Sequence, residues 1–327
     1  MKKRVVFRAD GDAEIGYGHF IRTLAIASLI NEDFNCIYAT QAPTEYQVSE
    51  ISKVCSEIIK LSKSNKSFDE FLSFLKNDDI VVLDNYFFDT DYQLLIKKIG
   101  CKIVFIDDYN HRNYVCDALI NNIPGFPVNS FNRQEYTKLY LGTDYALLRK
   151  EFFNPELRQI EKKENAIFIS FGGGDFLNLS DKIIGFLNQI NINFEIHLLI
   201  GDAFKFGESL KKYKNIAIYK NISADEVAHL IASCSICVIP ASSLLNEAAS
   251  IGSFILLGYF ADNQIQPYDY FIENDLALGL GDYRTLNFKN FKEKFNQLFG
   301  LSYLKENQSK AYHYQQASNL KNIFYEI

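Results

Sequence analysis

The stretch at residues 15–22 constrains the fold of this chain more than any other. It reads Ile15-Gly16-Tyr17-Gly18-His19-Phe20-Ile21-Arg22. An apolar, β-branched segment (4–9) precedes it, and a nearly unbroken apolar segment (20–30) follows it. A strand, a glycine-bearing loop and a helix in this order are typical of the first unit of a doubly wound domain. The sequence therefore predicts an α/β fold built on a parallel sheet.

The residues of this loop also predict a ligand site. Gly16 and Gly18 let a ligand approach the backbone, and the N–H groups at a helix start attract anions. His19 is the one residue of the loop that can accept a proton near neutral pH. Steric turn glycines and a helix-capping His remain an open alternative. A third glycine of the G-x-G-x-x-G pattern is missing, because Ile21 stands in its place, which argues against NAD.

Length and charge limit the classes of function. With 327 residues, of which 48% are hydrophobic and 23% charged, the chain has the composition of a soluble globular protein with two domains. A net charge of −6 gives no basic surface for nucleic acid. No segment approaches the length of a membrane span, so we expect a cytoplasmic protein without a membrane partner. No stripe of an obligate interface is visible, so we expect a monomer.

The cysteines do not predict a metal or redox site. Cys234 and Cys237 have C-x-x-C spacing, but neither a second such pair nor a His pair accompanies them. We therefore expect buried free thiols, no bound metal and no cofactor.

Polar clusters follow three predicted strands in the first half of the chain. Strands are expected at 35–40, 79–85, 101–108 and 118–122, with helices at 68–75 and 92–99 between them. The clusters are 84–86, 107–109 and 121–122, and parallel strands bring them to the edge where His19 lies. Adjacent residues point to opposite faces of a strand, so Asp107 and Asp108 are not expected to act as a facing acid pair. At least one of them should cap a turn.

A second α/β pattern follows a rise in charge over 156–164, and we place the domain boundary near Asn154. A strand at 166–171 leads into Gly172-Gly173-Gly174-Asp175, and a helix is expected at 179–190. Strands at 194–200, 216–219, 236–239 and 253–260 follow. Ser223 and Glu226 are expected to form a capping box. Helices at 287–299 and 304–325 would close the chain, and they could pack back on the first domain.

The segment 240–247 predicts a second anion site. Ser242 and Ser243 stand at a helix start, where backbone N–H groups and hydroxyls can hold a phosphate. Glu247, one turn further on, could accept hydrogen bonds from ribose hydroxyls. Plain N-capping by the serines, and a tight turn at 172–174, are the structural alternatives.

Two Rossmann-like domains facing each other across a cleft form the GT-B architecture, and the motifs resemble one GT-B-like family, PseG/SpsG. The matching segments run in family order over nearly the whole chain. They are Arg8-x-Asp10, Ile15-Gly16-x-Gly18-His19-x-x-Arg22, Asp84-Asn85-Tyr86, Phe105-Ile106-Asp107-Asp108, 145–152, Gly172-Gly173-Gly174-Asp175, 241–248 and Asn263-Gln264. One departure is Ser242-Ser243, where many members have Gly-Gly.

This resemblance implies a metal-independent hydrolase of pseudaminic acid (nonulosonic acid) biosynthesis, a pathway of flagellin glycosylation. Its substrate would be UDP-2,4-diacetamido-2,4,6-trideoxy-β-L-altropyranose, cleaved at the anomeric carbon. His19 would be the base that activates water, with Tyr86 and Asn263 around the sugar and the water. The remaining implied site residues would bind substrate or UDP: Gly16, Gly18, Arg22, Gly173, Gly174, Ser242, Ser243, Leu244, Glu247 and Gln264.

Two other classes of protein remain possible from the sequence. A GT-B glycosyltransferase would keep the UDP-binding half and transfer the sugar to an acceptor instead of water. A non-catalytic UDP-sugar binder would need neither His19 nor an enclosed water.

Overall fold

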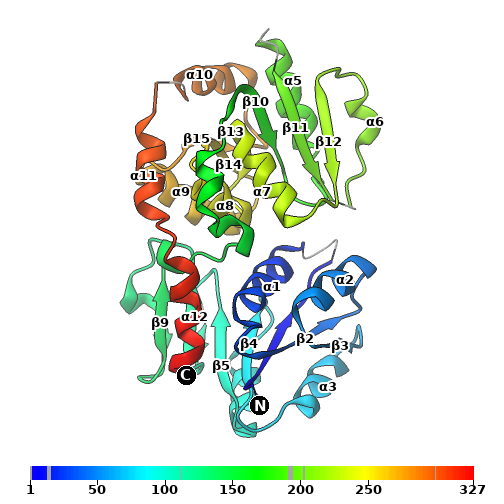
Figure 1. The fold of residues 1–327 in the computed structure, drawn as a ribbon, viewed down its shortest axis with the longest axis vertical. Helices are drawn as coiled ribbons and strands as arrows, with labels where there is room; N and C mark the ends of the chain where they lie inside the picture. The colour runs from blue at the N-terminus through cyan, green and yellow to red at the C-terminus, as the bar shows by residue number, and fades with distance from the viewer. Residues whose placement is uncertain (1, 13–15, 111, 191–193, 202, 299) are drawn as a thin grey trace. The chain divides into compact units, whose positions relative to one another are not determined.

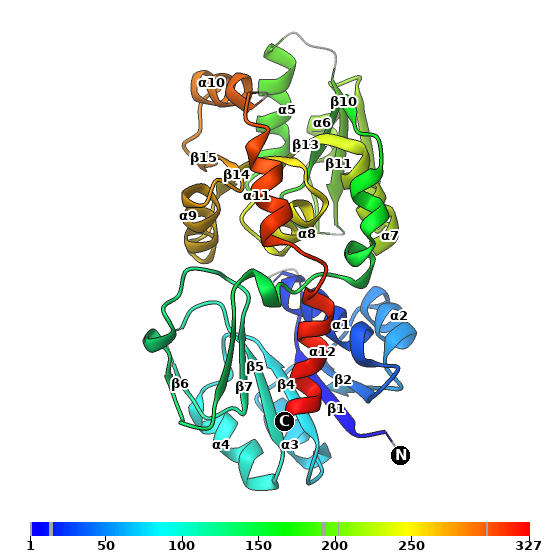
Figure 2. The same cartoon turned by 60° about the vertical axis from the view of Figure 1, so that its left-hand side comes forward.

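The computed structural model describes residues 2–12, 16–110, 112–190, 194–201, 203–298 and 300–327. The chain forms two compact units, one of residues 1–150 and 315–327 and one of residues 151–314 (Figures 1 and 2). It passes from the first unit to the second after Lys150, where the sequence suggested a boundary near Asn154. It returns to the first unit between Tyr314 and Gln315.

The N-terminal unit is a doubly wound parallel sheet. Its described strands lie in the order β3-β2-β1-β4-β5-β7-β9. The strands are β1 (Arg4–Ala9), β2 (Asn35–Gln41), β3 (Glu57–Leu61), β4 (Ile80–Asp84), β5 (Lys102–Ile106), β7 (Ala118–Asn121) and β9 (Lys138–Leu141). The helices are α1 (Gly18–Ile30), α2 (Glu45–Val54), α3 (Lys66–Phe74), α4 (Thr90–Ile99) and α12 (Gln316–Glu326). Short pairs and turns complete the unit: β6 (Asn113–Tyr114) with β8 (Asn132–Arg133), η1 (Val128–Ser130) and η2 (Thr143–Tyr145).

Both faces of this sheet are covered by apolar side chains. One face packs on α3 and α4, with Phe71 and Ile96 buried against Val81. The other face packs on α1, which is buried nearly all round. There the ring of Phe20 meets that of Tyr38 on β2 at 5.8 Å. Burial on both faces explains why these strands read as continuous apolar runs in the sequence.

The C-terminal unit repeats the design with strands in the order β12-β11-β10-β13-β14-β15. The strands are β10 (Lys163–Ile169), β11 (Glu195–Ile200), β12 (Ile216–Lys220), β13 (Cys234–Pro240), β14 (Phe254–Tyr259) and β15 (Leu278–Asp282). The helices are α5 (Leu179–Gln189), α6 (Gly207–Leu210), α7 (Ala224–Ser233), α8 (Ser243–Ile251), α9 (Ile265–Glu273), α10 (Phe288–Leu298) and α11 (Tyr303–Ala311). The 3₁₀ turns are η3 (Lys150–Phe153), η4 (Pro155–Gln159) and η5 (Asp262–Gln264).

Helices α5 and α10 lie side by side over one face of this sheet (Figure 1). Ile183 of α5 and Phe295 of α10 are fully buried there against strand residues such as Ile236. The predicted capping box at the start of α7 is confirmed: Glu226 N–H donates to the Ser223 hydroxyl, and Ser223 N–H donates to the Glu226 carboxylate.

The prediction of one closing helix over 304–325 is wrong. The structure has two helices there, α11 and α12, with a break at residues 312–315. Tyr312 is 1% exposed, and its hydroxyl donates to Asn246 Oδ1 at 2.6 Å. Tyr314 adopts a positive φ of 36°. The buried tyrosine ends α11 on the C-terminal unit, and the chain then continues into a helix of the other unit.

Helix α12 is part of the N-terminal unit (red in Figures 1 and 2). It packs against α1 and the η2 turn. The ring of Phe324 meets that of Phe34 with centroids 6.0 Å apart. Lys138 Nζ and Tyr140 Oη donate to the carboxylate of Glu326.

Each sheet has one switch point, where consecutive strands run outward in opposite directions. In the N-terminal unit it lies between β1 and β4, and in the C-terminal unit between β10 and β13. Ligands of doubly wound folds bind beyond the carboxyl ends of the strands at such points. Helix α1, which carries His19, follows β1, and the loops at 170–178 and 241–242 follow β10 and β13.

Candidate active site

His19 is the second residue of α1 and is 5% exposed. Its Nδ1 lies 2.8 Å from Oδ1 of Asp84, the last residue of the neighbouring strand β4. Gly16, in the loop between β1 and α1, has a φ of +84°, a conformation that a side chain would strain. Gly18 is exposed, with no heavy atom within 4 Å of the place where a Cβ would lie. Of the predicted loop motif, Ile15 lies outside the described residues.

Arg22, one turn after His19, joins two carboxylates. Its Nε donates to Asp84 Oδ2 at 2.5 Å, and its Nη2 donates to Asp84 Oδ1 at 2.5 Å. Its Nη1 donates to both carboxylate oxygens of Asp108, at 2.8 and 2.7 Å. Every guanidinium nitrogen is therefore bonded to a carboxylate of the N-terminal unit. These bonds link the start of α1 to the residues that follow β4 and β5.

The charges of this cluster depend on each other. Burial alone would lower the pKa of Arg22, but the carboxylates of Asp108 and Asp84 raise it well above its ordinary value. Burial alone would raise the pKa of Asp84, but Arg22 and His19 hold it below its ordinary value. Asp84 is therefore an anion that holds the imidazole and the guanidinium in place.

The hydrogen bond to Asp84 determines which nitrogen of His19 can accept a proton. An ionised carboxylate only accepts hydrogen bonds, so Nδ1 carries a hydrogen and donates it to Asp84. Arg22 Nη2 lies further away, at 3.2 Å from Nδ1, and already donates to Asp84. We therefore assign the proton-accepting role to Nε2.

Tyr86 completes the cluster from the loop after β4. Its ring meets the imidazole of His19 edge to face, with centroids 4.7 Å apart. Its hydroxyl donates weakly to Asp108 Oδ2, at 3.4 Å. Arg112 Nη2 donates to the backbone oxygen of Tyr86 at 2.7 Å, which fixes the loop. The structure thus brings together His19, Arg22 and Tyr86 of the predicted site.

Asp84 and Asp108 are not among the predicted site residues, although both stand in the polar clusters that follow β4 and β5. Asp107 instead caps a turn, because its carboxylate accepts hydrogen bonds from Tyr109 N–H and Asn110 N–H. Asp108 points to Arg22. The expectation that at least one residue of this pair caps a turn is confirmed.

The glycine loop of the C-terminal unit follows β10. Gly172 has a φ of +80°, and the carbonyl of Gly173 accepts a hydrogen bond from Gly201 N–H at the end of β11. The ring of Phe176 occupies the space beside Gly174, where a Cβ would lie 2.5 Å from it. The loop is therefore anchored at one glycine and covered at another.

Asp175 caps the N-terminus of α5, the first of the two helices that begin at this edge of the sheet. Its carboxylate accepts hydrogen bonds from Leu179 N–H at 2.8 Å and Ser180 N–H at 2.9 Å. Burial raises the pKa of Asp175, and those hydrogen bonds oppose the rise. The N-terminus of α5 is thus already occupied by an acid of the chain.

The start of α8 is different. Ser242 is its N-cap residue and is exposed, but its side chain makes no capping hydrogen bond. Ser243 and Leu244 are half-buried, and Glu247, one turn further on, is 4% exposed. The N-capping alternative for Ser242 is therefore not observed. Neither helix start is capped by its own N-cap side chain, but at α5 the N–H groups of Leu179 and Ser180 already bond to the carboxylate of Asp175.

Asn263 and Gln264 lie in η5, which follows β14, the strand next to β13. The amide oxygen of Gln264 accepts a hydrogen bond from Phe260 N–H at 2.9 Å, so this part of the side chain stabilises its own turn. Asn263 is half-buried. The residues predicted to bind UDP thus follow three adjacent strands of one sheet.

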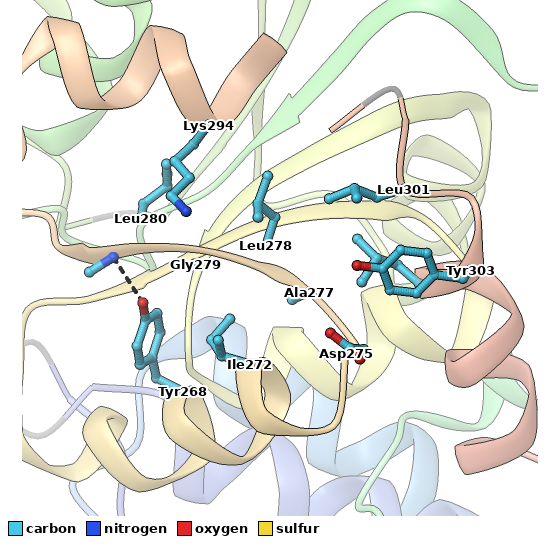
Figure 3. Close-up of a pocket in the computed structure, with 12 residues that line it drawn as sticks. Tyr268, Ile272, Asp275, Ala277, Leu278, Gly279, Leu280, Lys294, Leu301 and Tyr303 are labelled. Carbon is cyan, nitrogen blue, oxygen red and sulfur yellow. Dashed lines mark hydrogen bonds between the residues drawn. The ribbon is translucent and has the colours of Figure 1, made fainter. Parts of the chain in front are cut away.

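A hollow of about 380 Å³ lies elsewhere in the C-terminal unit (Figure 3). It borders the outermost strand β15, where Tyr268 Oη accepts a hydrogen bond from Gly281 N–H at 3.1 Å. Its lining residues include Asp275, Lys294 and Tyr303 but none of the predicted site residues. The hollow is therefore separate from the carboxyl edge of β10 and β13.

All six cysteines are free and buried, as predicted, and burial raises the pKa of Cys234 to about 12 and of Cys237 to about 11. Among the residues that the structure describes, no group of three His, Cys, Asp or Glu side chains could hold a metal ion. Within the same residues, no helix has both the length and the apolar character needed to cross a membrane.

Solved structures place the fold in the GT-B class, which confirms the fold prediction of two Rossmann-like domains. MurG of Acinetobacter baumannii matches 99% of this chain and 100% of its own, with a TM-score of 0.69 and 13% identity. The calicheamicin glycosyltransferase CalG4 matches 99% of this chain and 98% of its own, with a TM-score of 0.68 and 12% identity. Identities this low establish the fold alone.

Relatives in sequence confirm the predicted resemblance to PseG and SpsG. The UDP-2,4-diacetamido-2,4,6-trideoxy-β-L-altropyranose hydrolase of Campylobacter jejuni is 29% identical over 75% of this chain and 87% of its own. The spore coat polysaccharide biosynthesis protein SpsG of Bacillus subtilis is 24% identical over 84% of this chain and 82% of its own. The uncharacterized protein MJ1062 of Methanocaldococcus jannaschii is 27% identical over 83% of this chain, and the match spans 58% of that protein's length. No protein-family model matches the chain.

Proposed function

We propose that this protein is a metal-independent UDP-sugar hydrolase. The substrate is UDP-2,4-diacetamido-2,4,6-trideoxy-β-L-altropyranose, the compound named for the Campylobacter relative, and the pathway is pseudaminic acid biosynthesis. The observation that carries the proposal is the hydrogen bond from His19 Nδ1 to Asp84. It leaves Nε2 as a base beside the ring of Tyr86, at the switch point where doubly wound folds bind ligands.

The reaction needs one base and a stabilised leaving group. Nε2 of His19 takes a proton from water as the water oxygen attacks the anomeric carbon. The bond from that carbon to the β-phosphate oxygen breaks, and UDP leaves with the electron pair. Asp84 stabilises the imidazolium that forms, and Arg22 holds Asp84 in place.

The C-terminal unit supplies the nucleotide site in this proposal. The N-terminus of α8, with Ser242 and Ser243, holds the diphosphate and stabilises the charge that develops on it. The glycine loop at 172–174 lies at the end of the adjacent strand β10. Glu247 accepts hydrogen bonds from the ribose hydroxyls. Asn263 would lie near the sugar and the water.

Release of UDP from purified protein tests the proposal. A panel of UDP-sugars is incubated with and without sugar acceptors, in water enriched in ¹⁸O. We expect UDP release without acceptor, with the label in the free sugar and none in UDP, because water attacks carbon. Release only with an acceptor would make the protein a glycosyltransferase, as CalG4 is named. Binding without release would make it a UDP-sugar binder.

A further inference from the structure

We infer that Tyr109, together with Tyr86, forms the apolar wall that selects the sugar of the substrate. This inference rests on the proposed function and adds a residue that determines specificity. Tyr109 follows β5, beside the loop that carries Tyr86. The two rings meet edge to face with centroids 5.2 Å apart, and the ring of Tyr86 meets that of His19 at 4.7 Å. The ring of Tyr86 therefore contacts both the proposed base and the ring of Tyr109.

Both tyrosines are exposed although their backbone is fixed. Tyr86 is 38% exposed and Tyr109 39%. Tyr86 N–H donates to Asn85 Oδ1 at 2.8 Å, and Tyr109 N–H donates to Asp107 Oδ2 at 3.0 Å. A large ring on a rigid backbone offers contact area to a ligand at a small cost in conformational entropy. Two such rings beside a buried base are typical of a binding surface.

A neighbouring exposed ring shows the contrast. Phe87 is 37% exposed, but its ring packs against Phe68 at 5.8 Å and Phe88 at 4.6 Å. The guanidinium of Arg8 lies 5.8 Å from the centroid of the same ring. Phe87 therefore belongs to the packing between the sheet and α3, whereas the tyrosines extend from His19.

The chemistry of the wall favours a sugar with apolar substituents. The trideoxy, diacetamido sugar carries a methyl group at its last carbon and two acetyl methyl groups. Their contact with tyrosine rings removes apolar surface from water. A UDP-hexose with hydroxyl groups at the same positions would place polar groups against the rings, and unpaired polar groups lose free energy when they leave water. The wall would thus discriminate against fully hydroxylated UDP-sugars.

The experiment measures kcat and KM for Tyr109→Ala, Tyr109→Leu and Tyr109→Phe on two substrates. These are the UDP-linked diacetamido trideoxy sugar and UDP-glucose. We expect Tyr109→Ala to lower kcat/KM on the first substrate about 10- to 100-fold, mostly through KM, since apolar contacts of one or two methyl groups discriminate by this order. Tyr109→Phe should stay within about threefold, and Tyr109→Leu should lie between them. UDP affinity should not change.

Tyr303→Ala is the matched control, because Tyr303 is 42% exposed on the C-terminal unit. A Tyr109→Ala variant with unchanged kcat/KM, or with equal losses on both substrates, would overturn the inference. Should the alanine variant fail to fold, the comparison of the leucine and phenylalanine variants gives the same decision. A wild-type protein that releases no UDP from either substrate would instead refute the proposed function, before any variant is considered.

Discussion

Nδ1 of His19 lies 2.8 Å from Oδ1 of Asp84, a residue 65 positions further along the chain. One residue starts the helix after β1, and the other ends the neighbouring strand β4. The carboxylate also binds Arg22 from the same helix. Three hydrogen bonds, one from the imidazole of His19 and two from the guanidinium of Arg22, therefore connect one helix to one strand end. Rigid elements of this kind are how folds position reacting groups.

His19→Asn should lower kcat by about 10²–10⁴-fold, which is the range that a positioned general base contributes. Asparagine cannot accept a proton in the reaction, although it can still bond to Asp84. UDP affinity, measured by calorimetry, should stay nearly constant because we propose that the nucleotide is held by the C-terminal unit. His229→Asn is the matched control, since His229 lies on the exposed side of α7. A loss of less than about tenfold would show that His19 is not the base.

Asp84→Asn tests the acid dependence of stability. Arg22 and His19 hold the pKa of Asp84 below its ordinary value in spite of burial. A carboxyl whose pKa is lowered by folding stabilises the protein above its unfolded pKa of about 3.9, and this contribution is lost as the pH falls through the lower, folded pKa. At neutral pH the variant should lose about 3–5 kcal/mol, as expected when one member of a buried ion pair is removed.

Urea unfolding from about pH 6 down to about pH 3 measures this difference. The difference in the free energy of unfolding between the wild-type protein and Asp84→Asn should shrink as the pH falls. Asp225→Asn, at an exposed aspartate of α7, serves as the control. A difference in the free energy of unfolding that stays constant over the whole pH range would contradict the assignment of an ionised Asp84.

Much of the fold could be predicted because its signals are local. The continuous apolar strands, the glycine loops after β1 and β10, and the Ser223 capping box are all visible in short windows of sequence. The break between α11 and α12 is not, since neither Gly nor Pro occurs at residues 312–315. It depends on the buried contact between Tyr312 and Asn246, 66 positions apart. Strand β15 was missed because Gly279 and Gly281 make its sequence look like a turn.

The candidate site was predictable only in part, because some of its contacts join residues that lie far apart in the sequence. His19 and the serines of α8 stand at helix starts that the sequence marks clearly. Asp84 and Asp108 could be placed at an edge, but their pairing with Arg22 depends on strand order, which periodicity alone does not give. Hydrogen bonds show that Asp175 occupies the N-terminus of α5, and strand order shows that α8 follows the adjacent strand. The predicted diphosphate site is therefore proposed at Ser242 and Ser243.

Glu247→Ala should weaken UDP binding by about 1–3 kcal/mol, the value of a hydrogen bond to a charged group. Calorimetric titration with UDP and with 2′-deoxy-UDP isolates the contact, because the two ligands differ only in one ribose hydroxyl. The loss of affinity in the variant should be smaller for 2′-deoxy-UDP. Glu293→Ala, at an exposed position of α10, is the control. An unaltered affinity for UDP in Glu247→Ala would refute the ribose contact.

Turnover should survive EDTA. In the proposed reaction the N-terminus of α8 stabilises the charge on the leaving UDP and the base at His19 activates the water, so both roles of a metal ion are filled. The rate of UDP release is compared before and after dialysis against the chelator, with and without added Mg²⁺ or Mn²⁺. A rate that falls on chelation and returns with a divalent ion would overturn the metal-independent mechanism.

Phe324→Ala tests whether α12 stabilises the N-terminal unit in solution. Phe324 is 1% exposed, and its ring packs on Phe34, which is also buried. Removing a buried phenylalanine ring costs about 3–5 kcal/mol, because apolar contacts are lost and a cavity is left. Hydrogen exchange should therefore speed up in α1 and β1 of this variant, while UDP binding to the C-terminal unit is kept. Asn322→Ala, on the exposed side of the same helix, should change stability by less than about 0.5 kcal/mol. Equal exchange rates in the two variants would show that α12 does not stabilise the N-terminal unit.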